Sequence, residues 1–141
     1  MKIIKALEID VSNCIEGMPK PTGKNYIVSR AQDKKKKEKE DNAKGFTYQY
    51  IFAKQLSSIG FEAVLLEVQP NSQREKVETD AYEYKYMLSG ECIYIIGEDE
   101  VLIKEGDSIF FDGRIPHVPV NRSNTSAKIL VLYFFFNTQR E

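Results

Sequence analysis

From Gly45 onward, apolar and polar residues alternate with a period of two, a pattern typical of β-strands that bury one face. Turn-forming residues, mainly glycine, asparagine and aspartate, interrupt the pattern at intervals of about 8–12 residues. No segment in this part of the chain has helical periodicity. The pattern predicts strands at Gly45–Ala53, Phe61–Val68, Ala81–Leu88, Cys92–Ile96, Val101–Lys104, Ile109–Phe111, His117–Asn121 and Lys128–Phe136.

Short strands separated by turns predict an all-β sandwich or barrel rather than a parallel α/β sheet. The second strand is expected to end at Pro70–Asn71, because proline and asparagine favour turns. The last strand is almost continuously apolar, so we expect it to be buried on both faces. The first strand is expected to place four aromatic residues on one face: Phe46, Tyr48, Tyr50 and Phe52.

Residues 1–44 lack this pattern, and we expect them to form an N-terminal arm and a charged loop beside a barrel domain of residues 45–141. Within them, only Asn25–Arg30 resembles a short strand. The run KKKKEKED at Lys34–Asp41 predicts a solvated loop or a short exposed helix. A phosphate-binding arm is the alternative, but the three acidic residues of this run oppose the positive charge that such binding requires.

The composition narrows the possible functions. The chain has 141 residues, 42% of them hydrophobic and 29% charged, as expected for a single globular domain. A formal net charge of −1 argues against a nucleic-acid partner. Cys14 and Cys92 form no CxxC pair, so we predict neither a disulfide framework nor a thiolate zinc site. The single histidine, His117, excludes mechanisms that need two or three imidazoles.

No segment resembles a leader peptide or a membrane anchor. Lys5 and Glu8 interrupt the apolar residues near the start of the chain. The longest apolar run, Ile129–Phe136, is far shorter than the roughly 20 residues that a membrane-spanning helix needs. We therefore expect a soluble, cytoplasmic protein without membrane partners.

Two sets of residues carry a family resemblance. Gly106, His117 and Asn121 are spaced as in the second signature motif of the cupin superfamily, whose P-x-G element is replaced here by Asp-Gly-Arg at residues 112–114. Glu83 and Gly90 are spaced as at the end of the first cupin motif.

Over roughly residues 45–136, the chain most resembles the cupin domains that follow a helix-turn-helix module in bacterial regulators. Residues 1–44 are too few and too irregular to hold that module. The resemblance implies a double-stranded β-helix, which is a small antiparallel barrel or jelly roll with a cavity at one end. It also implies a homodimer formed through sheet edges and the N-terminal arm.

In most catalytic cupins, two histidines and a glutamate of the first motif and one histidine of the second bind Fe, Mn, Ni or Zn. This chain keeps Glu83 and His117. The two missing histidine positions correspond to Lys76 and Glu78 or, with a spacer one residue shorter, to Val77 and Thr79. None of these residues is histidine.

Two interpretations of the site remain open. In the first, Lys85 enters the cavity on the same strand face as Glu83, its ammonium repels cations, and no cofactor is expected. In the second, Glu78 joins Glu83 and His117 around a divalent transition metal, with Asp80 as a further donor.

The same alternation predicts that Tyr82, Tyr84 and Tyr86 face away from the cavity and suit an interface between subunits. Arg114 is expected either at the cavity mouth, in contact with an anionic ligand, or in a solvated loop. The ligand-binding residues are therefore expected to be Glu83, Lys85, His117 and Arg114.

Three functions fit these residues. The first is a metal-free barrel that binds a small polar or anionic organic molecule as a sensor or accessory protein. The second is a metal-dependent isomerase, epimerase or dioxygenase with a carboxylate-rich site. The third is a structural dimer whose cavity is filled by its own side chains, including Met87 and Lys85. We favour the first, because the resemblance to the cupin domains of regulators favours a binding role and no nucleophile is identifiable beside His117.

Overall fold

The computed structural model describes residues 25–33, 35–37 and 44–136. Over these residues the fold is all-β, as the alternating pattern predicts, with one short 3₁₀ helix, η2 (Ala31–Asp33), before the barrel. The strands are β1 (Lys35–Lys37), β2 (Lys44–Gln55), β3 (Ile59–Gln73), β4 (Ala81–Ser89), β5 (Glu91–Ile96), β6 (Asp99–Lys104), β7 (Ser108–Asp112), β8 (His117–Val120) and β9 (Ala127–Phe136).

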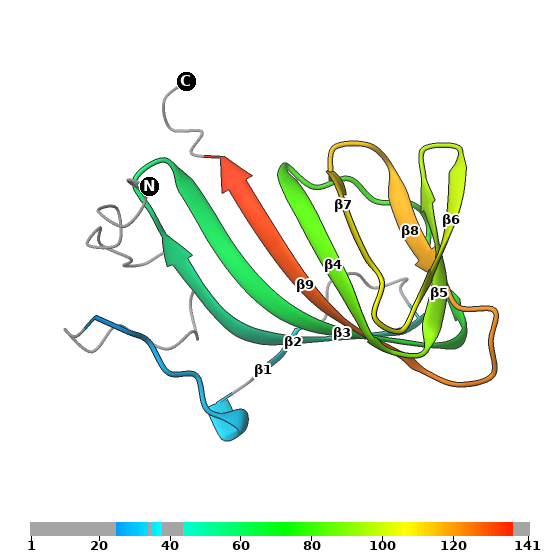
Figure 1. The fold of residues 1–141 in the computed structure, drawn as a ribbon, viewed down its shortest axis with the longest axis horizontal. Helices are drawn as coiled ribbons and strands as arrows, with labels where there is room; N and C mark the ends of the chain where they lie inside the picture. The colour runs from blue at the N-terminus through cyan, green and yellow to red at the C-terminus, as the bar shows by residue number, and fades with distance from the viewer. Residues whose placement is uncertain (1–24, 34, 38–43, 137–141) are drawn as a thin grey trace.

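The strands form two antiparallel sheets (Figure 1). The large sheet has the order β1-β2-β3-β9-β4-β7, and the small sheet has the order β6-β5-β8. In Figure 1, the long strands β2, β3, β9 and β4 run side by side, and the small sheet stands at the right-hand end. Because β9 pairs with both β3 and β4, the last strand of the chain connects β1–β3 to β4 and β7 within the large sheet.

The core lies between the inner faces of the two sheets. On β4, buried residues alternate with less buried ones, and the buried set includes Glu83, Lys85 and Met87. Tyr86 on the opposite face is 37% exposed, so the predicted orientation of the β4 tyrosines agrees with the structure. The apolar core is formed by Tyr48, Val64, Leu66, Val68, Ala81, Met87, Cys92, Tyr94, Ile103, Ala127, Ile129, Val131 and Tyr133.

The predicted end of the second strand was wrong, because β3 continues past Pro70 and Asn71 to Gln73. Asn71 adopts a positive φ of 61°, a conformation that asparagine tolerates better than most residues, and its N–H donates to the carbonyl of Asn121. The pairing with β2 is irregular over this stretch, which accommodates a proline that has no N–H to donate. The extension carries the chain onward to Arg74.

The prediction of one aromatic face on the first strand was wrong at Phe52. Tyr50 pairs with Val64, but a bulge follows and Phe52 pairs with Ala63. Adjacent residues of β3 face opposite sides, so the bulge turns Phe52 to the outer face, where its ring lies 5.5 Å from that of Phe61.

The last strand has only one fully buried face. Ala127, Ile129 and Val131 are buried, whereas Leu130 and Leu132 on the outer face are only half-buried, because nothing in the described part of the chain covers that face completely. The two-sided burial predicted from its apolar run was therefore wrong.

The segment before the barrel also differs from the prediction. Residues 26–30 form no strand, whereas Lys35–Lys37 of the charged run pair with β2 as strand β1 rather than as a loop or a helix. Residues 1–24, Lys34 and residues 38–43 lie outside the described residues, together with the predictions for Cys14 and for the first part of the arm. The division at residues 44 and 45 stays a prediction. The described residues include no helix long and apolar enough to cross a membrane.

Candidate functional site

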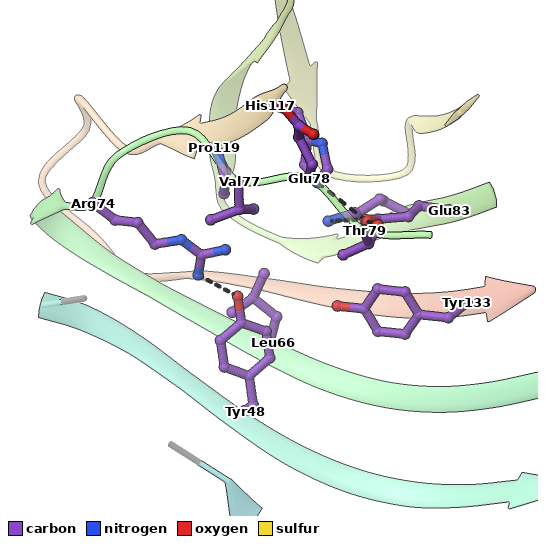
Figure 2. A pocket seen from close by; sticks show the side chains of 11 residues that line it. Tyr48, Leu66, Arg74, Val77, Glu78, Thr79, Glu83, His117, Pro119 and Tyr133 are labelled. Carbon is purple, nitrogen blue, oxygen red and sulfur yellow. Dashed lines mark hydrogen bonds and ion pairs between the residues drawn. The ribbon is translucent and has the colours of Figure 1, made fainter. Parts of the chain in front are cut away.

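A cavity of about 90 Å³ opens between the inner face of the large sheet and the start of β8. A volume of this size holds several water molecules or a small organic molecule. The residues that line it are Tyr48, Leu66, Arg74, Val77, Glu78, Thr79, Glu83, Lys85, His117, Pro119 and Tyr133 (Figure 2).

Glu83 is at the centre of the polar contacts in this cavity. The Lys85 Nζ atom lies 2.9 Å from Glu83 Oε1. The Thr79 hydroxyl donates to Glu83 Oε2 at 2.5 Å, and His117 Nε2 lies 3.1 Å from the same oxygen. Glu83, Lys85 and His117 are only 1%, 4% and 3% exposed, so water does not screen these contacts.

Three separate segments bring these side chains together. Glu83 and Lys85 lie two residues apart on β4, so the pleat of the strand turns both side chains to the inner face. His117 begins β8, and its main chain exchanges two hydrogen bonds with Val77. This bridge also fixes the position of Thr79, two residues along the chain from Val77.

Burial and close charged neighbours shift the pKa values of Glu83 and Lys85. Burial alone would raise the pKa of Glu83, but the Lys85 ammonium and the contacts from His117 and Thr79 hold it well below its usual range. Burial alone would likewise lower the pKa of Lys85, but the Glu83 carboxylate, with smaller contributions from surrounding tyrosines, raises it well above its usual range. The two side chains are therefore a charged pair at neutral pH.

Both ring nitrogens of His117 contact protein oxygens. Nδ1 lies 2.7 Å from the carbonyl oxygen of Ile115, and Nε2 lies 3.1 Å from Glu83 Oε2. These two contacts fix the orientation of the ring in the cavity wall.

Aromatic rings surround the charged pair on its apolar side. The Lys85 ammonium lies 4.8 Å from the centre of the Tyr94 ring and 5.7 Å from that of Phe111. The Phe111 ring in turn packs edge-on against His117. These contacts stabilise the positive charge of a buried ammonium.

Arg74 enters the cavity from the end of β3. Its Nη1 donates to the Tyr48 hydroxyl at 2.6 Å, as Figure 2 shows. Phe46 and Tyr48 pack against its guanidinium, with ring centres 4.8 and 5.8 Å from Cζ. No sequence pattern pointed to Arg74, because this residue follows the predicted end of the strand.

Sequence comparison identifies the family. A family model described as "Cupin domain" matches residues 64–133. The chain belongs to the cupin superfamily. The two antiparallel sheets accordingly form a cupin jelly roll, as the two motifs implied. No curated protein matches the chain in sequence.

Several solved structures resemble this one in fold. The polyketide cyclase RemF from Streptomyces resistomycificus matches with a TM-score of 0.61 at 19% identity, over 74% of this chain and 76% of the cyclase. The FeII form of HppE matches with a TM-score of 0.63 at 20% identity, over 81% of this chain and 62% of HppE. The cupin domain of an XRE family transcriptional regulator from Enterobacter cloacae matches with a TM-score of 0.50 at 20% identity, over 54% of this chain and 81% of that domain.

The cupin metal position does not fit a metal ion in this chain. Val77 and Thr79 lie beside His117 and Glu83, so the shorter spacer gives the positions of the missing histidines. Both oxygens of Glu83 already contact protein groups, and Lys85 presents a positive charge there. Nowhere in the described part of the chain do three or more histidine, cysteine, aspartate or glutamate side chains form a group that could hold a metal ion.

The residues of the alternative metal set do not come together. Glu78 lines the cavity but is exposed, and Asp80 is exposed and does not line it. A metal ion at Glu78, Glu83 and His117 would therefore need these side chains to move.

Arg114 lies outside the cavity. Its Nε and Nη2 donate to the two carboxylate oxygens of Asp112, each at 2.9 Å, in the exposed turn after β7. These contacts raise the pKa of Arg114 and lower that of Asp112. The structure thus brings together three of the four predicted ligand-binding residues, Glu83, Lys85 and His117.

Two motif residues act by holding the site in shape. A Cβ atom on Gly113 would overlap the Thr79 hydroxyl and would lie 2.6 Å from the Ala81 carbonyl oxygen. Asn121, which is 1% exposed, donates to the carbonyls of Val68 and Thr125 and so joins β3 to the loop before β9.

Proposed function

We propose that this cupin binds a small polar or anionic organic molecule in its cavity, without a metal ion, and serves as a sensor or accessory binding protein. The observation that carries the proposal is the engagement of Glu83 by Lys85, Thr79 and His117. These contacts occupy the carboxylate that a metal would need, and they leave a polar cavity whose groups are already ordered.

An enzymatic role has less support in this geometry. Both ring nitrogens of His117 already contact protein oxygens, those of Ile115 and Glu83, so neither nitrogen is directed at a substrate as a base. Lys85 is held as an ammonium by Glu83, and an ammonium has no lone pair for nucleophilic attack.

A cavity filled by its own side chains is also less well supported. Met87 packs in the apolar core rather than in the cavity. Lys85 lines the cavity, but a volume of about 90 Å³ stays open beside it.

The proposal is tested with protein purified without a histidine tag, analysed for transition metals and screened by thermal shift against small sugars, amides, amino acids and organic acids. We expect at least one compound class to stabilise the protein by mass action, equally with and without EDTA. The double variant Glu83→Gln/Lys85→Met removes both charges together, and we expect it to fold but to lose this stabilisation.

Either of two results would overturn the proposal. One is the absence of stabilisation by every compound in the screen. The other is a near-stoichiometric transition metal in the purified protein together with ligand binding that EDTA abolishes.

A further inference from the structure

The unusual group in the cavity is the guanidinium of Arg74. Its Nε is buried and has no hydrogen-bond partner among the described residues. Within the same residues, its hydrogen bond runs from Nη1 to the neutral hydroxyl of Tyr48. No carboxylate among the described residues pairs with it. A buried N–H without an acceptor costs free energy. The edge of the guanidinium formed by Nε and Nη2 therefore suits a hydrogen-bond acceptor that a ligand supplies.

Arg114 shows how the same edge is used elsewhere in this protein. The Nε and Nη2 of Arg114 form the paired hydrogen bonds to the Asp112 carboxylate described above. The corresponding edge of Arg74 makes no such contact within the described residues. A guanidinium recognises a planar carboxylate best through two parallel N–H donors.

The Arg74 guanidinium is also held in place. The packed rings of Phe46 and Tyr48 and the hydrogen bond to the Tyr48 hydroxyl restrict its plane. A donor pair that is already oriented loses little conformational entropy when it binds. In Figure 2 the guanidinium reaches into the cavity between Val77 and Pro119 on one side and Tyr48 and Leu66 on the other.

The pairing of the other buried charges favours an anionic group at Arg74. Lys85 is paired with Glu83, 2.9 Å away, whereas Arg74 has no carboxylate partner among the described residues. A ligand carboxylate would supply that partner, and its planar shape matches two parallel N–H donors.

We infer that the ligand is a small organic monocarboxylate whose carboxylate binds the Nε–Nη2 edge of Arg74. Leu66, Val77 and Pro119 supply apolar contacts for a short carbon skeleton, and the volume of about 90 Å³ limits its size. This inference rests on the proposed function, because it names the ligand class of the same cavity.

The test is isothermal titration calorimetry of the full chain with acetate, lactate and pyruvate, and with acetamide, lactamide and inorganic phosphate. We expect at least one carboxylate to bind and its amide to bind at least 10-fold more weakly. Arg74→Gln should weaken carboxylate binding by at least 10-fold, and Arg74→Lys should weaken it less, because a lysine keeps the charge but loses the paired donors.

The matched control is Arg122→Gln. Arg122 is an exposed arginine with only a loose contact to Glu100 at 3.9 Å, and its loss should leave carboxylate affinity unchanged. Thermal unfolding of each variant checks that it is folded.

The outcomes separate the two proposals. Binding of amides or phosphate without binding of carboxylates would overturn this inference and leave the proposed function standing. Carboxylate binding that Arg74→Gln does not weaken would also overturn it. Failure of every probe here and of every compound in the thermal-shift screen would overturn both.

Discussion

Lys85 determines the chemistry of the cavity at the scale of single residues. In a cupin with a metal site, Glu83 would be a ligand, but here Lys85 occupies one of its oxygens as a charged partner. A buried ion pair contributes little net stability, yet the loss of one partner is costly, because the other remains as an uncompensated buried charge. Lys85 therefore makes Glu83 a fixed part of the cavity wall.

We predict that Lys85→Met destabilises the protein by about 3–5 kcal/mol at pH 7, because it leaves the Glu83 carboxylate buried without its ammonium. Glu83→Gln/Lys85→Met should recover most of this loss, because it removes both charges. Urea denaturation of the three proteins measures the effect. A double variant no more stable than Lys85→Met would show that charge is not the cause.

The cost of Lys85→Met should also depend on pH. In the folded wild type, the pKa of Glu83 lies well below its ordinary value of 4.5. The ionised Glu83 carboxylate therefore stabilises the folded state fully above pH 4.5, and this stabilisation is lost progressively as the pH falls below 4.5. Between pH 5 and pH 3, the difference between wild type and Lys85→Met should shrink by about 2 kcal/mol. A difference that stays constant over this range would contradict the pairing.

At the scale of elements, the turn between β7 and β8 holds the segment that contains Thr79 next to the start of β4. The N–H of Thr79 donates to the carbonyl of Gly113, and the N–H of Gly113 donates to the carbonyl of Ala81. A side chain at position 113 would be pressed against Thr79 and Glu83. The absence of a side chain at Gly113 therefore leaves room for Thr79 beside Glu83.

We predict that Gly113→Ala destabilises the protein by about 1–3 kcal/mol, the usual cost of forcing extra volume into a packed region. Gly60→Ala is the matched control, since its Cβ would approach only a flexible Gln55 side chain at 3.0 Å and the Phe135 Cβ at 3.7 Å. Urea midpoints of both variants test this. Equal losses in the two variants would show that the crowding at Thr79 is not decisive.

At the scale of the whole molecule, the outer face of the large sheet carries apolar side chains on β4 and β7. Tyr86, Leu88 and Phe110 are 37%, 43% and 59% exposed, and the rings of Tyr82 and Phe110 stack at 5.5 Å. Among the described strands, β7 is an edge of this sheet. An apolar face beside an open edge is a natural surface for association.

We therefore expect a homodimer that buries this outer face, and we predict that Phe110→Lys shifts it toward the monomer. Leu102→Lys is the control, because Leu102 is similarly exposed, at 48%, but lies on β6 of the small sheet. Light scattering coupled to size-exclusion chromatography measures both. A monomeric wild type, or a dimer that Phe110→Lys leaves intact, would contradict the prediction.

The sequence alone determined the features that depend on neighbouring residues. The period of two fixes that Glu83 and Lys85 share one face of a strand while Tyr86 points to the other, because the pleat is a local property of the backbone. The motif spacing in turn identified Glu83 and His117 as parts of one site, and the structure places them 3.1 Å apart.

Only the tertiary structure decided which distant groups meet. The bulge that turns Phe52 outward and the extension of β3 that delivers Arg74 depend on pairing with β2, which no local pattern records. The two oxygens that contact the His117 ring likewise come from its own turn and from β4. Alternation along β4 places Glu83 and Lys85 in the cavity, but packing between strands brings His117 and Arg74 to them.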